Sequence, residues 1–207
     1  MHKYHTGGVN NTDFSFFALS QSIDQLCAEI GVSADRLQIQ NIEFGVNVET
    51  PISATEIIED VICYKNRLPA NPINDNKGYY TQYKLNDYIV KLYDKAKQYH
   101  MKTPLLRWEI KAVKQRFVAD CGVQLLSDLK DIGNVQALAA KLIACFENLI
   151  FDDSSIIAEE LTMRERRLYE KWQNPKIWAK LKGGKKSADY ANARRFKGIV
   201  SKHGKYA

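Results

Sequence analysis

Hydrophobic and polar residues alternate along three stretches of the chain, at residues 37–49, 87–95 and 105–112. Because successive residues of a β-strand point to opposite faces of its sheet, this alternation predicts half-buried strands. The connection at 96–104 is short enough for the second and third strands to be antiparallel neighbours. The aromatic-rich residues 79–85 predict a hairpin partner for the strand at 87–95.

One face of these predicted strands is apolar, and the opposite face carries charged side chains and a tyrosine. If the strands belong to one sheet, the charged side chains lie together on one side of it. Carboxylates, cations and a tyrosine on one surface are typical of a functional site. The set comprises Glu43 from the first stretch, Lys91, Tyr93 and Lys95 from the second, and Arg107, Glu109 and Lys111 from the third.

Helical spacing of apolar residues appears in four further segments. The predicted helices lie at 16–30, where Gly31 is a natural stop, at 53–62, at 125–129, and at 135–149 with Asn134 as its cap. Ser53 and Glu56 have the spacing of a capping box. Residues 2–11 predict the end of a strand and a Gly/Asn turn, and residues 66–78 predict a loop.

The C-terminal region carries its own helix signals. Thr162 and Glu165 have capping-box spacing, and Asn174 precedes a proline at the first helical position. Gly183-Gly184 predicts a break before the last helix.

The expected fold class is α+β, with an antiparallel sheet and helices packed on one of its faces. This part occupies residues 1–151. A polar joint at 152–155 leads to a basic helical C-terminal segment at 156–207.

The net charge of +6 is unevenly distributed along the chain. Residues 162–207 contain fourteen Lys and Arg against three acids, so the rest of the chain is net acidic. Cations release counterions from a phosphate backbone and flat rings stack on bases, so this segment indicates a nucleic-acid contact surface. A solvated basic tail and a surface for an acidic partner protein are the alternatives. The interleaved aromatic residues are Trp172, Trp178, Tyr190 and Phe196.

Other features restrict the class of protein. The N-terminus has no signal-peptide pattern and no apolar run approaches about 18 residues, so we expect neither a membrane span nor export, but a cytoplasmic location. The Gly-rich motifs of dinucleotide and P-loop sites are absent. The cysteines form no C-x-x-C pair and are expected to be buried free thiols; they are Cys27, Cys63, Cys121 and Cys145.

Short motifs of residues 1–150 resemble a known family. They are His2-Lys-Tyr with Gly8 and Asn11-x-Asp13-Phe14, Asn41-Ile-Glu-Phe-Gly-Val-Asn47, Ile89-x-Lys-x-Tyr-Asp-Lys95 and Leu106-Arg-x-Glu-Ile-Lys111. Together they look like replication initiation proteins of phages and mobile elements, similar to the gene II-type initiators of filamentous phages and the initiators of rolling-circle plasmids. The resemblance begins in what looks like the middle of a strand, so we expect a copy shortened at its N-terminus.

The resemblance implies DNA replication initiation by strand nicking at a rolling-circle origin. In such initiators a divalent metal polarises one backbone phosphate and a tyrosine attacks it. The enzyme keeps a covalent 5′-phosphate, and the freed 3′-hydroxyl primes synthesis. Since Mg²⁺ and Mn²⁺ prefer carboxylate oxygens, the candidate ligands are Glu43, Glu109 and Asp94. Lys91, Lys95 and Arg107 would hold phosphate oxygens and stabilise the developing charge.

Two tyrosines are candidate nucleophiles. Tyr93 lies on the charged face, and Tyr169 lies on a basic helix C-terminal to the sheet, where such enzymes often supply the nucleophile. As structural alternatives, Tyr169 is a simple helix-face residue, Glu109 forms a cross-strand ion pair, and Glu43 is a solvated strand residue.

Many nicking initiators bind metal through an H-x-H or H-x-x-x-H cluster, and this chain has neither. A carboxylate-only site would have to serve, and a non-catalytic DNA-binding protein derived from such an initiator is the alternative function. The expected partner is single-stranded DNA or an origin duplex. The expected DNA contacts are Lys3, Tyr4, Lys91, Lys95, Arg107, Lys111, Arg164, Arg167, Lys171, Arg194 and Arg195.

Overall fold

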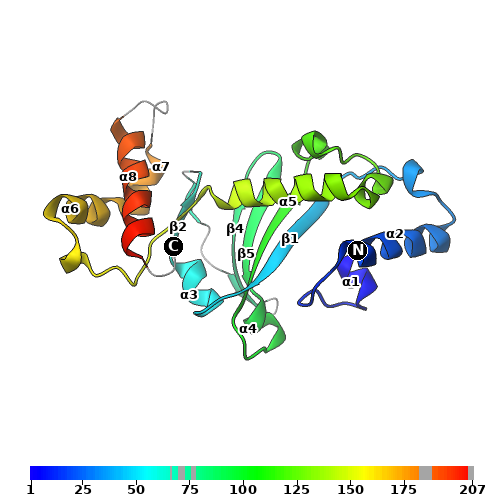
Figure 1. Ribbon diagram of the computed structural model, residues 1–207, viewed down its shortest axis with the longest axis horizontal. Coiled ribbons are helices and arrows are strands. Elements are labelled where there is room, and N and C mark those ends of the chain that lie inside the picture. The colour runs from blue at the N-terminus through cyan, green and yellow to red at the C-terminus, as the bar shows by residue number, and fades with distance from the viewer. Residues whose placement is uncertain (66, 70–72, 76–77, 182–187, 205–207) are drawn as a thin grey trace.

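A five-stranded antiparallel sheet lies at the centre of the molecule in the computed structural model (Figure 1). The structure describes residues 1–65, 67–69, 73–75, 78–181 and 188–204. The strand order is β1-β6-β5-β4-β3. The strands are β1 (Ile42–Glu49), β3 (Ile73–Asp75), β4 (Gly78–Lys84), β5 (Tyr88–Asp94) and β6 (Leu105–Ala112).

The register of β5 and β6 sets which side chains share a face. Val90 pairs with Ile110 and Leu92 with Trp108, and these four side chains are buried on one side. Lys91 pairs with Glu109 on the other side. The strand alternation, the antiparallel pairing of β5 with β6 and the hairpin between β4 and β5 are therefore confirmed.

The apolar face of the sheet packs against α5 (Ile132–Phe146) and α3 (Ala54–Glu59). Trp108 is central to this core, and its indole nitrogen donates a hydrogen bond to the carbonyl oxygen of Leu142 in α5. Ser53 caps α3 by accepting a hydrogen bond from the amide of Thr55. The α+β class and the packing of helices on an antiparallel sheet agree with the prediction.

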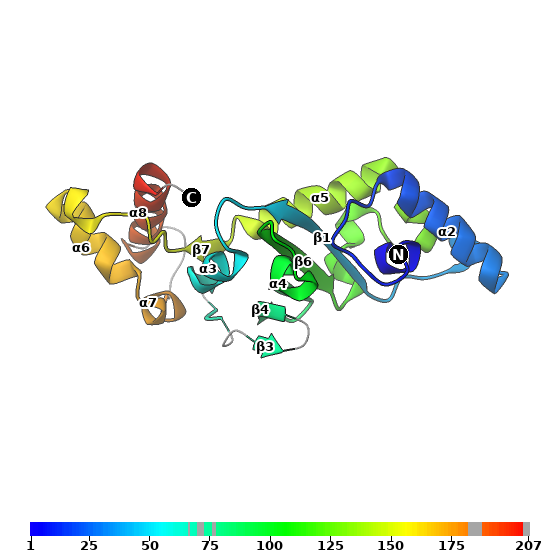
Figure 2. The same ribbon diagram turned by 90° about the horizontal axis from the view of Figure 1, so that it is seen from below.

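The N-terminal part of the chain forms α1 (His2–His5) and α2 (Phe16–Ile30). Ser15 caps α2, and Gly31 ends it in the left-handed conformation that glycine adopts without strain. The connection between the two helices has no regular structure and runs past β1 in both views (Figures 1 and 2).

A second, two-stranded sheet joins β2 (Val61–Tyr64) to β7 (Leu149–Phe151), and the C-terminal helices pack against it. These helices are α6 (Met163–Trp172), α7 (Pro175–Ala179) and α8 (Ala188–His203), at one end of the molecule in Figure 1. Ile62 and Ile150 share a core with Trp172 and Phe196. One hydrophobic core therefore contains side chains from before and after the joint expected at residues 152–155.

The remaining elements are short. They are α4 (Lys95–Tyr99), η1 (Ala34–Arg36), η2 (Gln115–Phe117), η3 (Ala119–Cys121), η4 (Leu126–Lys130) and η5 (Ala158–Glu160). A third core cluster, around Ile23 of α2 and Val123, joins the N-terminal helices to the far end of α5.

Several sequence-based boundaries were wrong. The residues after His2 form a helix and not the end of a strand. The helix expected at 53–62 stops at Glu59. Val61 and Ile62 instead begin β2, which pairs with β7; Val61 is buried in the core of the larger sheet and Ile62 against the C-terminal helices. Asp131, not Asn134, caps α5.

Other local predictions were partly confirmed. The Thr162 capping box is present, and Asn174 caps α7 before its proline. The first strand begins later than expected, at Ile42, and the segment at 125–129 is a 3₁₀-helix. Part of the loop at 66–78 forms β3. The Gly183-Gly184 break lies outside the described residues, and all four cysteines are free thiols, three of them buried.

Candidate functional site

Lys91 is the centre of the charged face of the sheet. Its Nζ lies 3.3 Å from Oε1 of Glu43 and 3.3 Å from Oε1 of Glu109. Burial lowers the pKa of Lys91, but the neighbouring Tyr93, Glu109 and Glu43 outweigh that effect and raise it overall. Strands β1, β5 and β6 thus bring these predicted residues together around one ammonium group.

Glu109 is buried between two cations. Nε of Arg107 donates to its Oε2 at 2.8 Å, and the guanidinium also donates to the side-chain oxygen of Asn47 at 3.0 Å. Glu109 is 6 % exposed and Arg107 is 8 % exposed. The carboxylate therefore forms ion pairs both along its own strand and across to β5.

Glu43 lies at the open side of the network. Its Oε1 is also 3.0 Å from Nζ of Lys111. Burial raises the pKa of Glu43, while Lys111 and Lys91 lower it more strongly, so the net shift is downward. Glu43 is paired, and not the purely solvated strand residue of the structural alternative.

Tyr93 lies beside this network. Its ring centroid is 5.9 Å from Nζ of Lys91 and 5.4 Å from Nζ of Lys95, and the ring packs on Tyr80 of β4. Burial, followed by the charge of Glu109, raises the pKa of Tyr93, and Lys91 opposes this rise. The phenol is thus held near two ammonium groups but remains protonated at neutral pH.

Lys95 is 4 % exposed, and its ammonium lies 5.4 Å from the ring centroid of Tyr93 and 5.2 Å from that of Tyr99. It donates to Oδ1 of Asn10 at 3.0 Å and to Oε1 of Gln98 at 2.6 Å. Within the described part of the chain it forms no ion pair with a carboxylate. Burial, followed by the charge of Arg107, lowers the pKa of Lys95 to about 8.

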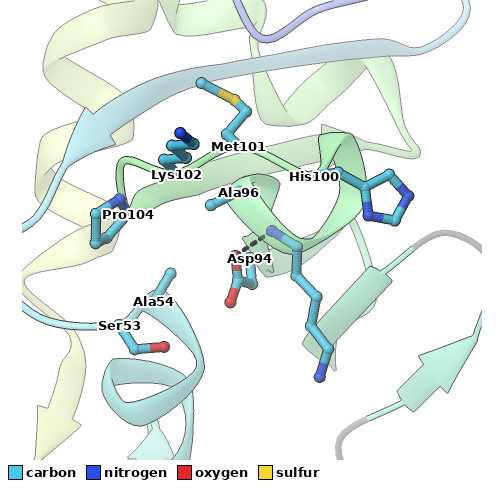
Figure 3. Close-up of a pocket in the computed structure, with 9 residues that line it drawn as sticks. Ser53, Ala54, Asp94, Ala96, His100, Met101, Lys102 and Pro104 are labelled. Atoms are coloured by element: carbon cyan, nitrogen blue, oxygen red, sulfur yellow. Dashed lines mark hydrogen bonds between the residues drawn. The ribbon is translucent and has the colours of Figure 1, made fainter.

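Asp94 lies apart from Glu43 and Glu109. It caps α4 by accepting from the amide of Lys97 at 2.8 Å, and it accepts from the hydroxyl of Thr55 in α3 at 2.7 Å. Figure 3 shows its carboxylate facing the space between α4 and α3, across from Ser53. The structure therefore does not support Asp94 as a third metal ligand, since strand parity directs it to the other face of the sheet.

That space is a pocket of about 420 Å³. Asp94 is its only acid, and both carboxylate oxygens already accept hydrogen bonds from the protein. The pocket is lined by Ser53, Ala54, Asp94, Ala96, Lys97, His100, Met101, Lys102 and Pro104.

The positions of Glu43 and Glu109 around Lys91 test whether these two carboxylates could bind the expected metal ion. Two carboxylate oxygens that share a divalent ion at about 2.1 Å each lie at most about 4.2 Å apart. Here Glu43 and Glu109 instead share the ammonium of Lys91 at longer distances. No group of three acid, His or Cys side chains suited to a metal occurs among the described residues. Glu43 and Glu109 could hold Mg²⁺ or Mn²⁺ only after Lys91 moves aside.

Tyr169 is not placed to act as a nucleophile. It is 3 % exposed, stacks on Phe196, and its hydroxyl donates to Oδ1 of Asp152 at 2.6 Å. Burial, followed by the hydrogen bond to Asp152, raises its pKa above the ordinary range. The prediction for Tyr169 is corrected to a core residue of the C-terminal helices, in line with the helix-face alternative.

Three predicted DNA contacts line a groove along α6. Arg164, Arg167 and Lys171 are exposed and, among the described residues, form no ion pair. Their spacing of three and four residues places them on one face of the helix. The groove is completed by Met163, Leu168, Trp172 and Asn192 of α8.

The other predicted contacts are scattered. Lys3 and Tyr4 are exposed on α1, and partial desolvation of the phenol, followed by a hydrogen bond to Glu29, raises the pKa of Tyr4 to about 12. Arg194 and Arg195 are exposed on α8. The structure therefore gathers seven of the predicted cations into two groups, four on the sheet and three along α6, and leaves Lys3, Arg194 and Arg195 outside both.

The sequence did not single out two asparagines that organise the charged face. Asn47 accepts from Arg107 and donates to the backbone oxygen of Asn10 at 3.1 Å, and Oδ1 of Asn10 also accepts from Tyr99 at 3.0 Å. Asn47 lies on the same face of its strand as Glu43, so strand alternation could have assigned it to the charged face. Asn10 lies in an irregular segment, so no periodicity could have placed it on the sheet.

Gly45 is a further unpredicted feature of this face. A Cβ at this position would lie 2.9 Å from Cα of Glu109 and closer still to the carbonyl oxygen of Trp108. Such distances are far shorter than ordinary packing contacts, so β1 and β6 approach closely because position 45 has no side chain.

The chain matches no protein-family model, no curated protein and no solved structure. In the described part of the chain, no helix has the length and apolar character needed to cross a bilayer.

Proposed function

We propose that this protein binds DNA and takes part in initiating replication of a phage or mobile element. One observation carries the proposal: on the charged face of the sheet, Lys95 and Arg107 are buried and Glu109 is the buried carboxylate beside them. Lys91 is half-buried and shares Glu109 with Arg107, while its second partner, Glu43, is exposed. An excess of buried positive charge is costly unless an anion compensates it, and the DNA backbone supplies such anions.

The basic groove along α6 supports the same proposal. Arg164, Arg167 and Lys171 point their charges to solvent, with no ion pair among the described residues to neutralise them. Phosphate contacts of this kind give affinity without sequence preference. Together with the sheet they would supply two contact regions for one DNA molecule.

Binding is tested with single-stranded and duplex oligonucleotides over a range of salt concentrations. We expect log affinity to fall linearly with log salt, with a slope of about −0.7 per phosphate neutralised on single strands and about −0.9 on duplex. Lys95→Gln and Lys91→Gln should each weaken binding. Affinity that is undetectable or independent of salt would refute the proposal.

Tyrosine-mediated nicking is a second candidate, favoured by the position of Tyr93. The ring centroid lies 5.9 Å and 5.4 Å from two ammonium groups that would stabilise phosphoryl oxygens, and two carboxylates converge on Lys91 next to it. Attack by the phenol oxygen would form a bond to phosphorus and break the bond to the 3′-oxygen of the preceding nucleotide, and the phenol's proton would end on that oxygen, which leaves as a hydroxyl. The DNA 5′-phosphate would then be attached to the protein.

Nicking is tested with labelled origin-containing single strands and added Mn²⁺ or Mg²⁺. A covalent adduct that Tyr93→Phe abolishes and Tyr80→Phe preserves would support it, because Tyr80 packs on the same ring but lies on β4. If no adduct forms with either metal while salt-dependent binding persists, the protein is a non-catalytic DNA-binding protein.

A further inference from the structure

Asn10 places its two carbonyl oxygens where three donors of the charged face converge. Nζ of Lys95 and the hydroxyl of Tyr99 both donate to Oδ1, at 3.0 Å each. Nδ2 of Asn47 donates to the backbone oxygen of the same residue at 3.1 Å. An ammonium, a phenol and an amide thus bind one uncharged residue.

These donors are better suited to an anion than to an amide. Lys95 is almost completely buried, yet in the described chain its ammonium has only neutral acceptors. Burial and then the charge of Arg107 lower the pKa of Lys95, Glu109 opposes this, and Lys3 and Lys91 add to the lowering. A buried ammonium in a positive field gains more from a phosphoryl group than from a neutral carbonyl, because charge-assisted hydrogen bonds are stronger.

The contacts of the segment that carries Asn10 are mostly local. It has no helix or strand between α1 and α2, and Val9 is 40 % exposed. The Thr6 hydroxyl donates to the carbonyl oxygen of Val9, and His2 stacks on Phe14 within the same N-terminal region. Asn11 donates to Sδ of Met101, a weak acceptor, at 3.6 Å. Displacing Asn10 from the sheet would therefore leave these local contacts in place.

We propose that Lys95, Tyr99 and Asn47 form a pocket for a phosphoryl group of DNA, and that Asn10 occupies this pocket in the free protein as an uncharged substitute. The N-terminal segment then acts as a latch that a phosphate displaces. This inference deepens the proposed function, since it rests on DNA as the ligand and assigns how access to the sheet is controlled.

Inorganic phosphate is the first probe, measured by calorimetry on the full chain. Asn10→Asp puts a carboxylate next to Lys95, so we expect phosphate affinity to fall at least about tenfold through the added ion pair. Asn10→Ala removes the competing oxygen of the side chain and should raise affinity several-fold. The matched control is Asn11→Ala, which should leave affinity unchanged.

Lys95→Gln tests the pocket from the other side and should abolish phosphate binding. If that variant fails to fold, the Asn10 variants still decide the question, because they alter an irregular surface segment. Equal phosphate affinity in Asn10→Asp, Asn10→Ala and the unaltered chain would overturn the proposal.

Oligonucleotides separate the two sources of a phosphoryl group. If a single strand with a 5′-phosphate competes with inorganic phosphate and the unphosphorylated strand does not, the pocket takes a terminal phosphate; equal competition indicates an internal phosphodiester. If inorganic phosphate does not compete with DNA and the Asn10 variants do not change DNA affinity, the latch is overturned and the proposed function stands. If the Asn10 variants change phosphate affinity as expected but the protein does not bind DNA, the proposed function is overturned and the phosphate pocket stands.

Discussion

Lys91 and Glu109 face each other across β5 and β6, with Nζ of the lysine 3.3 Å from Oε1 of the glutamate. Arg107 approaches the other oxygen of the same carboxylate. Removing the negative charge would leave two mostly buried cations without this partner. Glu109→Gln should therefore lower the free energy of unfolding by about 3 kcal/mol, as is typical when one member of a buried pair is lost.

Urea unfolding of the variant measures this loss. The control is Glu43→Gln on the same network, because the Glu43 side chain is 41 % exposed and exposed pairs contribute about 1 kcal/mol or less. Equal losses in the two variants would contradict the assignment of Glu109 as the buried centre of the network.

The groove along α6 should control the salt dependence of DNA binding. Arg167→Gln removes an unpaired cation of the groove and should weaken binding to all sequences alike, reducing the log-log salt slope by about 1. Arg166→Gln is the control, since Arg166 lies on the same helix but is paired with Glu170 at 2.8 Å. Filter-binding titrations at several salt concentrations compare the two, and a larger change for Arg166 would exclude the groove as the contact.

Asp60 should make stability depend on pH. Burial, followed by the charges of Asp152 and Asp153, raises its pKa from the ordinary value of 3.8 to about 6. The folded state then binds the proton of Asp60 more tightly than the unfolded state does. The stability that comes from this protonated carboxyl is therefore lost as pH rises from about 4 to above 6. Asp60→Asn should stabilise the fold by up to about 2 kcal/mol at pH 7 and have no such effect at pH 3.5.

Thermal unfolding of both chains across that range provides the measurement. A stabilisation by Asp60→Asn that is the same at both pH values would show that the carboxyl group does not titrate in this window.

Gly45→Ala should destabilise the sheet by about 2 kcal/mol or more, because the added carbon would force the backbones of β1 and β6 apart. The control is Gly198→Ala in α8, where a Cβ meets no atom within 4 Å. That substitution should stabilise the protein by about 0.5 to 1 kcal/mol, since alanine favours a helix interior. Denaturant unfolding should give changes in the free energy of unfolding of opposite sign for the two variants. If Gly45→Ala does not lose stability, the close approach of β1 and β6 is contradicted.

The strands of the charged face were predictable from sequence because alternation has a period of two and their apolar partners are unambiguous. Lys91, Tyr93, Arg107 and Glu109 were found together for this reason. Asp94 was misplaced because it was chosen by residue type, although its parity puts it with Leu92 on the core face.

Elements defined by distant contacts could not be predicted in the same way. The apolar run after Glu59 fits a helix by spacing, and only its antiparallel pairing with β7, far along the chain, makes it a strand. The sequence does not show that Tyr169 is buried, because the ring that stacks on it belongs to Phe196, twenty-seven positions later. Asn10 depends on a tertiary contact with Lys95 that no local pattern encodes.

The position of the C-terminal helices at one end of the molecule has an electrostatic consequence (Figure 1). Ten of the fourteen basic residues of 162–207 lie in the described part of this end, while the rest of the chain is net acidic. The protein is therefore a strong electric dipole along its long axis. In the field of a DNA molecule it would rotate so that α6 and α8 arrive first, and the acidic body would be held back until short-range contacts form. Orientation at encounter, and not only affinity after it, would then depend on ionic strength.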